Sequence, residues 1–173
     1  MTAIGKLDRR LTKALQEHPR SWRPFLHGLT MLGLPVITCA VALIASAISW
    51  SVNRTFSYAW LLGCVALLVN SILKLTLRRS RPETLYVNDM RFKSYSFPSG
   101  HAFGSLVLYG FAAYLAVTEV SWGAALATVL VMLILLIGFS RVYLGAHYVF
   151  DVLGGWLLGG LVLYLLITFA SAS

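Results

Sequence analysis

Three short groups of polar residues interrupt an otherwise apolar chain, and their side chains are of the types that bind and transfer phosphate. The groups are Lys74 with Arg81-Pro82, then Pro98-Ser99-Gly100-His101, and last Ser140-Arg141 followed by His147 and Asp151. Together they supply cations, backbone amides that a glycine leaves accessible, two histidines and one carboxylate. Such components could bind an anionic group, attack it and move a proton.

The third group pairs a histidine with a carboxylate. His147 and Asp151 are four residues apart at the start of an apolar run, so we predict that they share one face of a helix. A carboxylate that accepts the proton of one ring nitrogen leaves a lone pair on the other nitrogen, which makes a nucleophile or a general base. Taken alone, the two residues fit a purely structural pair at a membrane boundary equally well.

The second group has the features of an anion site at the start of a helix. Ser99 suits a helix N-cap, and Gly100 allows backbone amides to approach a ligand closely. Amides exposed at such an N-terminus attract an anion, and His101 could supply a proton there. Simple helix initiation, with His101 exposed to solvent, explains the same residues.

Cations from three parts of the chain complete the pattern. If the apolar runs cross a membrane, connectivity places Lys74, Arg81 and Arg141 on the same face. Arginine binds phosphate oxygens through a planar fork and lysine acts as a point charge, so the three could neutralise a phosphoryl group and its transition state. The usual flanking of membrane spans by basic residues explains Arg78 and Arg79, but not two histidines and an aspartate on that face.

The order and spacing of the three groups, K-x6-RP, PSGH and SR-x5-H-x3-D, resemble the type 2 phosphatidic acid phosphatase family, which is related to the vanadium haloperoxidases. The motifs are matched in full from Lys74 to Asp151. The resemblance implies that His147 is the nucleophile and forms a phosphohistidine, that Asp151 orients it and stabilises its charge, and that His101 protonates the leaving group and then activates water. It implies that the phosphoryl oxygens are bound by Lys74, Arg81, Ser99, Gly100 and Arg141.

The elements that must position these residues are membrane spans. Hydrophobic residues make up 58% of the 173 residues and charged residues only 12%, where soluble domains carry about 25% charged residues. Charge-free stretches of roughly 20 apolar-rich residues recur, the length of a helix that crosses about 30 Å of hydrocarbon. We therefore predict an all-α transmembrane bundle, in a single membrane-embedded domain of residues 1–173, with five spans near 25–49, 56–77, 99–118, 121–141 and 147–170.

Two further segments and one motif carry predictions. Residues 1–18 have apolar side chains at helical spacing with basic residues on other faces, which predicts an amphipathic helix in the membrane interface or docked on the bundle. Residues 78–98 form the one long loop and are the predicted active-site loop. Gly155 and Gly159 form a GxxxG motif, which favours close helix packing within the bundle or in a homodimer.

Composition also excludes several functions. The chain has six acidic residues, and Asp151 is the only one in the three groups, so we expect no metal and no other cofactor, since a two-metal site needs several carboxylate or histidine ligands. The net charge of +8 comes with no nucleic-acid motif, and its basic residues flank the spans, so we expect no nucleic-acid partner.

The sequence thus predicts an integral membrane phosphatase for a lipid phosphate or diphosphate monoester, because a site at a membrane face receives a headgroup while the tails stay in lipid. A phosphatase or phosphotransferase for a small soluble ester and a non-catalytic membrane scaffold are the alternatives. Five spans place the N-terminus and the site on one face. Positive-inside logic favours the cytoplasmic face, but the resemblance to bacterial relatives favours the extracytoplasmic face of the inner (cell) membrane, which we predict.

Overall fold

The computed structural model describes residues 3–17, 19–90 and 94–172, and within these ranges every regular element is a helix. The elements in chain order are α1 (Ala3–Gln16), a 3-10 turn (Arg20–Trp22), α2 (Arg23–Met31), α3 (Pro35–Ser49), α4 (Arg54–Leu77), α5 (Leu85–Asn88), α6 (Gly100–Glu119), α7 (Gly123–Tyr143) and α8 (Val149–Ser171). The predicted all-α class is confirmed.

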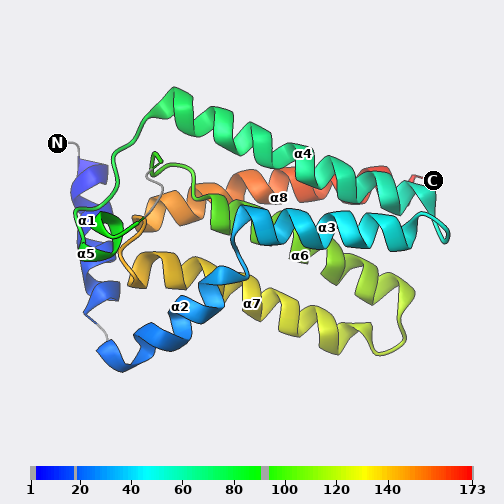
Figure 1. The fold of residues 1–173 in the computed structure, drawn as a ribbon, viewed down its shortest axis with the longest axis horizontal. Coiled ribbons are helices and arrows are strands. Elements are labelled where there is room, and N and C mark those ends of the chain that lie inside the picture. The colour runs from blue at the N-terminus through cyan, green and yellow to red at the C-terminus, as the bar shows by residue number, and fades with distance from the viewer. Residues whose placement is uncertain (1–2, 18, 91–93, 173) are drawn as a thin grey trace.

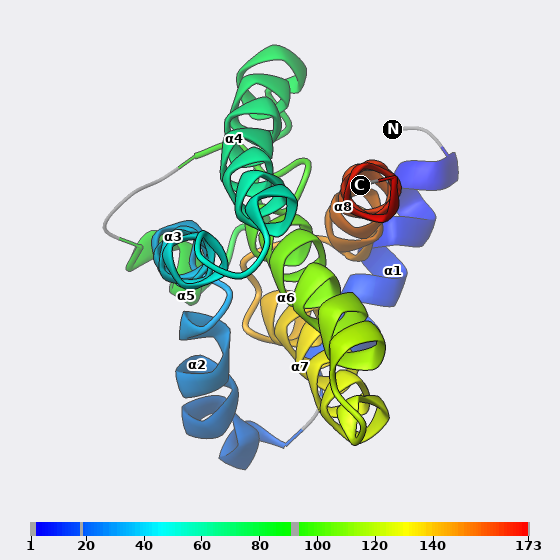
Figure 2. The ribbon, with the colours of Figure 1, turned by 90° about the vertical axis from the view of Figure 1, so that its right-hand side faces the viewer.

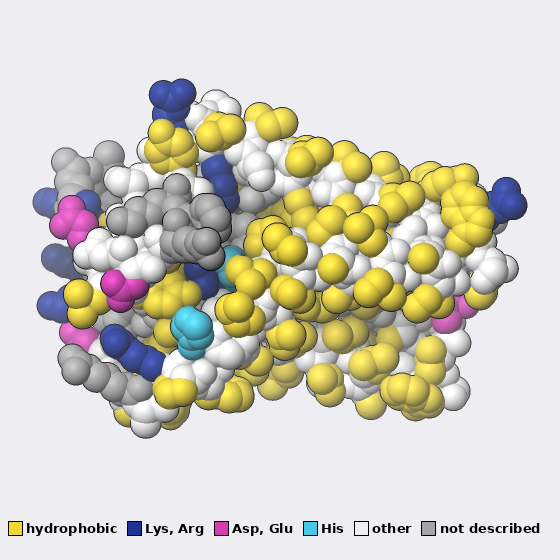
Figure 3. All heavy atoms as spheres, in the orientation of Figure 1, with side chains coloured by type: hydrophobic (Ala, Val, Ile, Leu, Met, Phe, Trp, Pro, Cys, Tyr) yellow, Lys and Arg dark blue, Asp and Glu magenta, His cyan; other side chains and the backbone are white. Residues whose placement is uncertain are grey.

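The long helices run side by side along the longest axis of the molecule (Figure 1). Four of them, α4, α6, α7 and α8, are long and apolar enough to cross a membrane, and α2 with α3 makes a fifth candidate as a bent pair. The bounds of the four unbroken spans lie within two residues of those predicted. Hydrophobic side chains cover the length of the bundle, and most Lys and Arg side chains on the visible face gather at the end where α1 lies (Figure 3).

The first span is broken, which corrects the prediction of one continuous helix over residues 25–49. The axes of α2 and α3 differ by 44°. Leu34 is extended at ψ 133°, as the residue before a proline prefers, and Pro35 then starts α3 without needing an amide partner. The hydroxyl of Tyr109 donates to the carbonyl of Leu32 over 2.7 Å, which satisfies one acceptor at the break. A cross-link from α6 therefore holds the bend.

Helix α6 is the centre of the bundle, between the α3–α4 pair and helices α7 and α8 (Figure 2). Its membrane-spanning window is 67% buried, against 22–28% for the other three spans. The GxxxG motif serves this packing, because a Cβ on Gly155 would lie 2.7 Å from the Ser99 carbonyl oxygen and one on Gly159 would lie 3.0 Å from that of Phe103. These glycines let α8 approach the backbone of α6. The motif therefore serves packing within the bundle, one of the two uses that the sequence predicted for it.

Helix α1 lies across one end of the bundle (Figure 1). It docks on α7 and α8. Asp8 and Thr12 of α1 are buried there and Leu15 packs against an apolar cluster, whereas Ile4, Leu7 and Leu11 are exposed. Of the predicted helix over residues 1–18, positions 1, 2 and 18 lie outside the described residues. The chain finishes at the opposite end of the bundle (Figure 1).

Candidate active site

The structure brings all eight predicted site residues to the end of the bundle where α1 lies. Each comes from the end of a helix or from a connection between helices: Lys74 from α4, Arg81 from the following loop, Ser99, Gly100 and His101 from the start of α6, Arg141 from α7, His147 from the next turn, and Asp151 from α8. The charges of Lys74, Arg81 and Arg141 act on both histidines. Residues far apart in sequence thus form one polar cluster.

A tight turn, not a helix, presents His147. Helix α8 begins at Val149, so the prediction that His147 and Asp151 share a helical face is wrong. The amides of Ala146 and His147 both donate to the carbonyl of Arg141, at 3.0 and 3.1 Å. Gly145 makes this turn possible at φ +82°, in the left-handed region that favours glycine.

The active-site loop supports the same turn from outside. The hydroxyl of Thr84 donates to the carbonyl of Gly145 over 3.0 Å and accepts the amide of Val87, which caps the short helix α5. A Cβ at Gly145 would lie 2.8 Å from Thr84 Cγ2, so the contact depends on glycine. Positions 91–93 of the predicted loop 78–98 lie outside the described residues.

The two ring nitrogens of His147 face groups of opposite charge. Nδ1 lies 3.5 Å from Asp151 Oδ2, and Nε2 lies 3.3 Å from Arg81 Nη1. The side chain is 1% exposed. Burial lowers the pKa of His147 well below its ordinary value, and Arg81, Arg141 and Lys74 lower it further. The imidazole is therefore neutral near pH 7, as a nitrogen nucleophile must be.

Asp151 is fully buried and its two oxygens are well supplied with donors. Oδ1 accepts from Arg79 Nη1 at 2.6 Å, and Oδ2 accepts from the Ser96 hydroxyl and from the amide of Tyr148 at 2.9 Å. A carboxylate removed from water needs such partners to stay ionised. Sequence reasoning missed Ser96, which no motif marks, and it assigned Arg79 to the ordinary basic flank of a span. That assignment is wrong, because Arg79 is a direct partner of the buried aspartate.

Lys74 and Arg81 point their charges inward and are held by the active-site loop. Lys74 Nζ donates to the carbonyl of Tyr95 over 2.9 Å. Arg81 donates through Nε to the carbonyl of Ser94 at 2.7 Å and through Nη1 to that of Ala146 at 2.9 Å. Burial and then repulsion by Arg141 lower the pKa of Arg81 to about 10. Cations held close together against their mutual repulsion form a site that favours an anion.

Arg141 is only 2% exposed and reaches toward the break of the first span. Its Nη1 donates to the hydroxyls of Thr30 at 3.0 Å and Tyr86 at 3.3 Å. Its Nε is buried and has no hydrogen-bond partner in the part of the chain that is described. Buried donors are rarely left unpaired, so this atom is available to a ligand. Thr30 and Tyr86 carry no sequence signal that would have identified them.

The start of α6 matches the predicted anion site in its backbone. Ser99 is the N-cap and its hydroxyl accepts the amide of Ala102. A Cβ on Gly100 would lie 3.2 Å from Asn70 Nδ2 and 3.8 Å from Lys74 Cε, so glycine keeps space open beside the lysine. His101 Nε2 is buried, with no hydrogen-bond partner among the described residues. The alternative of a solvent-exposed His101 is therefore wrong.

A large groove between α3 and α4, which we call the α3–α4 groove, leads to this site. Its volume is about 1160 Å³. Its head lies at Gly100, beside Asn70, Lys74 and Pro35. The other lining residues are mostly apolar: Val36, Cys39, Ala40, Leu43, Leu67, Leu68 and Leu75, with Ser71, Ser94 and Tyr95. One wall of the catalytic cluster is thus continuous with an apolar channel between two membrane helices.

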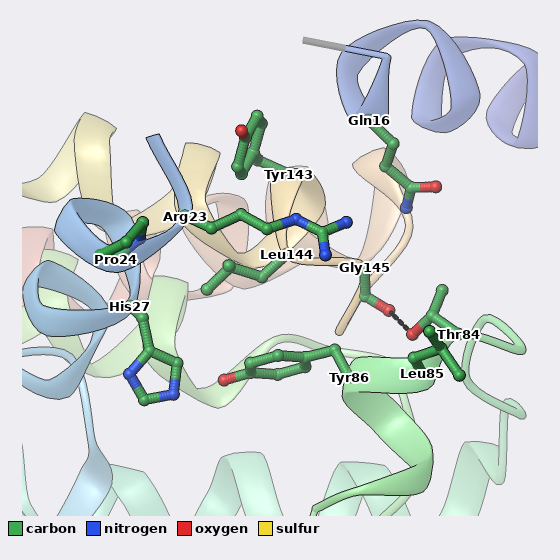
Figure 4. Close-up of a pocket in the computed structure, with 10 residues that line it drawn as sticks. All are labelled: Gln16, Arg23, Pro24, His27, Thr84, Leu85, Tyr86, Tyr143, Leu144 and Gly145. Atoms are coloured by element: carbon green, nitrogen blue, oxygen red, sulfur yellow. Dashed lines mark hydrogen bonds between the residues drawn. The ribbon is translucent and has the colours of Figure 1, made fainter. Parts of the chain in front are cut away.

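A second cavity, of about 370 Å³, is lined in part by Tyr86. Figure 4 shows the side chains of Arg23 and Gln16 directed into it, with His27 and Tyr86 on the facing wall. None of the eight predicted site residues lines this cavity. The α3–α4 groove, which contains Lys74 and Gly100, is the one connected to the predicted chemistry.

Comparisons with known proteins identify relatives of the chain. The family model of the PAP2 superfamily matches residues 54–173. The chain is 30% identical over 175 residues to phosphatidylglycerophosphatase B of Bacillus subtilis (strain 168), covering 94% of this chain and 83% of that protein. It is 31% identical over 105 residues to an undecaprenyl-diphosphatase of Sulfolobus acidocaldarius, covering 58% of this chain and 48% of that protein.

The fold also matches a solved structure. The crystal structure of a transmembrane PAP2-type phosphatidylglycerolphosphate phosphatase from Bacillus subtilis aligns with a TM-score of 0.78 and 28% sequence identity. The alignment covers 99% of this chain and 88% of that one. The likeness therefore includes α1 and the broken first span as well as the region that holds the three motifs.

Proposed function

The chain belongs to the PAP2 superfamily, and we propose that it removes phosphate from a membrane lipid phosphate or diphosphate monoester through a phosphohistidine at His147. The observation that carries the proposal is the setting of that histidine. Its Nδ1 faces the Asp151 carboxylate at 3.5 Å, and its Nε2 faces the cationic cluster at 3.3 Å from Arg81. In the structure the lone pair of Nε2 accepts from Arg81. A phosphoryl group that took over this arginine donor would meet the lone pair.

The proposed reaction has two steps. In the first, Nε2 of His147 attacks phosphorus, the bond from phosphorus to the leaving oxygen breaks, and His101 gives that oxygen a proton. In the second, His101 takes a proton from water, the resulting hydroxide attacks phosphorus, and the P–N bond breaks to release phosphate and neutral His147. Asp151 stabilises the positive imidazole between the two steps.

The phosphoryl oxygens are bound by Lys74, Arg81 and Arg141, by the hydroxyl of Ser99 and by the amide of Gly100. The Ser99 amide is not part of this set, because it donates to the carbonyl of Asp151 at 2.9 Å. These donors lie in a largely buried site, where they stabilise developing charge more strongly than in water. Loss of one such donor typically costs about 100- to 1000-fold in rate. Because the cations supply this charge, the proposed reaction needs no metal ion.

The α3–α4 groove supports a lipid as the substrate. A headgroup at Lys74 and Gly100 would leave its tails along apolar side chains of α3 and α4, which face the hydrocarbon of the membrane. Asn70 lies at the head of the groove, 4% exposed, and its Oδ1 has no hydrogen-bond partner within the described ranges. A hydroxyl group of the substrate could donate to it. The relative named phosphatidylglycerophosphatase makes that lipid the first to assay.

Phosphate release from purified protein tests the proposal. The panel is phosphatidylglycerophosphate, phosphatidate and undecaprenyl diphosphate in mixed micelles, with glycerol 3-phosphate as the soluble ester and H147A as the inactive control. We expect hydrolysis of at least one lipid and much slower hydrolysis of glycerol 3-phosphate. Equal rates on the soluble ester would contradict the lipid assignment, and no release from any substrate would favour the scaffold alternative.

The protein is a multi-pass membrane protein, and we propose that it lies in the inner (cell) membrane with the site on the extracytoplasmic face. Single cysteines at Asp89 and Ser171, in a background with both native cysteines replaced by alanine, test the face. Both positions are exposed and lie near opposite ends of the bundle. We expect an impermeant thiol reagent to label only D89C in intact cells. Labelling of S171C alone would place the site in the cytoplasm.

A further inference from the structure

Helix α1 touches the catalytic region through buried polar side chains. Thr12 Oγ1 accepts the amide of Val149 at 3.1 Å, and Asp8 Oδ1 accepts the amide of Phe150 at 3.0 Å. These are the first amides of α8, which have no partner within their own helix. Side chains of α1 therefore cap, from a distant part of the sequence, the helix that carries Asp151.

The second oxygen of Asp8 starts a chain of charges that leads to the nucleophile. Asp8 Oδ2 lies 2.5 Å from Arg79 Nη2, and Arg79 Nη1 lies 2.6 Å from Asp151 Oδ1. The ring of Tyr148 covers the guanidinium at 4.5 Å from its centroid. The rigid, planar fork of arginine suits two carboxylates at once. Asp151 in turn faces His147.

The orientation of α1 about its own axis places these polar contacts, together with Leu15, against the bundle. Burial of apolar side chains is the usual driving force for docking, yet Leu7 is 50% exposed and Leu11 41% exposed, while Asp8 is completely buried. A buried carboxylate is costly unless it is paired. The pairing with Arg79 and the α8 amides therefore explains why α1 turns its polar face to the bundle.

We infer that Asp8 and Arg79 are positioning residues of the active site, through which α1 fixes Asp151 and so His147. This inference rests on the proposed function. Arg79 is shared between two carboxylates, so Asp151 keeps more of its negative charge for the imidazolium of the phosphohistidine. Without the charge of Asp8, the whole guanidinium charge acts on Asp151. The positive imidazole is then stabilised less and the chemical step slows.

The test compares D8N, D8E, R79Q and the double variant D8N/R79Q with wild type, as full-length protein on the same lipid substrate. D89N and R78Q are matched controls: Asp89 is exposed, and the Nε of exposed Arg78 donates to the carbonyl of Leu75 in its own helix. D8N can keep the acceptor for the Phe150 amide, but it loses the charge and the acceptor for Arg79 Nη2. Folding of each variant is checked by its thermal unfolding.

We expect D8N to lower kcat about tenfold to a hundredfold, the range typical for an outer partner of a reacting group. The KM of D8N should stay within about twofold of wild type. D8E should retain more activity than D8N. R79Q removes the cation that two buried carboxylates share and leaves them only neutral hydrogen-bond donors. It should therefore lose more activity than D8N. The double variant should recover part of that loss, since coupled residues are not additive. Both controls should match wild type.

The pH profile separates positioning from folding alone. Loss of the Asp8 charge should move the acid limb of kcat/KM to lower pH, because His147 then binds a proton less readily. The other charged or titratable groups around His147 stay unchanged in D8N: Lys74, Arg81, His101, Arg141 and Asp151. An unmoved acid limb and unchanged kcat in D8N, with wild type active and H147A inactive, would overturn the inference and leave the proposed function intact. An inactive wild type would instead refute the function.

Discussion

Replacement of Asp151 by asparagine is the perturbation whose outcome the structure specifies most fully. Both carboxylate oxygens accept hydrogen bonds, Oδ1 from Arg79 and Oδ2 from Ser96 and from the Tyr148 amide. An asparagine amide has one acceptor oxygen only. In either orientation its NH2 group meets a donor, so at least one buried partner loses its bond.

The size of the catalytic effect follows from the distance to the nucleophile. A unit negative charge 3.5 Å from His147 Nδ1 interacts with an imidazolium by about 5 kcal/mol at an effective dielectric constant of about 20. Since about 1.4 kcal/mol changes a rate tenfold, loss of the charge should lower kcat by roughly three orders of magnitude. The lost charge-assisted hydrogen bond should also lower the free energy of unfolding by about 1.5–3 kcal/mol.

The assay is phosphate release by D151N under saturating substrate, with thermal unfolding measured on the same preparation. D89N serves as the control because Asp89 is an exposed acid of the active-site loop. KM should change little, because Asp151 contacts the nucleophile and not the phosphoryl oxygens. A folded D151N protein with kcat within tenfold of wild type would refute the argument that Asp151 stabilises the charged intermediate.

Three further predictions follow from the same geometry. Because the pKa of His147 is lowered, the acid limb of kcat/KM should lie below pH 6.5. The free energy of unfolding should keep its full His147 contribution above pH about 6.5 and fall as the pH drops below that value, because the unfolded state then binds a proton that the folded state does not. An acid limb above pH 6.5 would contradict the assigned environment. H101A should be rescued in part by a substrate with an activated leaving group, which needs no acid, whereas H147A should not; equal loss on both substrates would contradict the separate roles. Vanadate should inhibit competitively and EDTA should not inhibit, and R141A should bind vanadate more weakly; unchanged affinity in R141A would remove Arg141 from the phosphate site.

The sequence predicted the spans well wherever one apolar run corresponds to one helix, as in α4, α6, α7 and α8. It failed at the first span, because hydropathy does not distinguish a straight helix from two helices joined at an angle. Gly33 and Pro35 were the available signal for the break. A Cβ at Gly33 would lie 2.5 Å from Ile137 Cγ2 and 3.3 Å from His101 Cδ2, so the break itself lies against a site residue.

The residues of the candidate site were predicted from motif spacing, but their supports were not. Arg79 resembles any basic residue at the end of a span until its partners are known, and these lie 71 and 72 positions away, in Asp8 and Asp151. Ser96 likewise contacts Asp151 across 55 positions. Such pairs depend on how α1 and the active-site loop pack against α8, and no local periodicity encodes that packing.

Direct detection of phosphate on the protein tests the central claim. The H101A variant should be mixed with a phosphate-labelled substrate that has an activated leaving group, and quenched before turnover is complete. Such a substrate forms the intermediate without the acid, and hydrolysis of the intermediate is slowest without the general base. We predict an acid-labile, alkali-stable label on the peptide that contains His147, and no label in the double variant H101A/H147A. Label on another residue, or full turnover by H147A, would contradict the phosphohistidine mechanism.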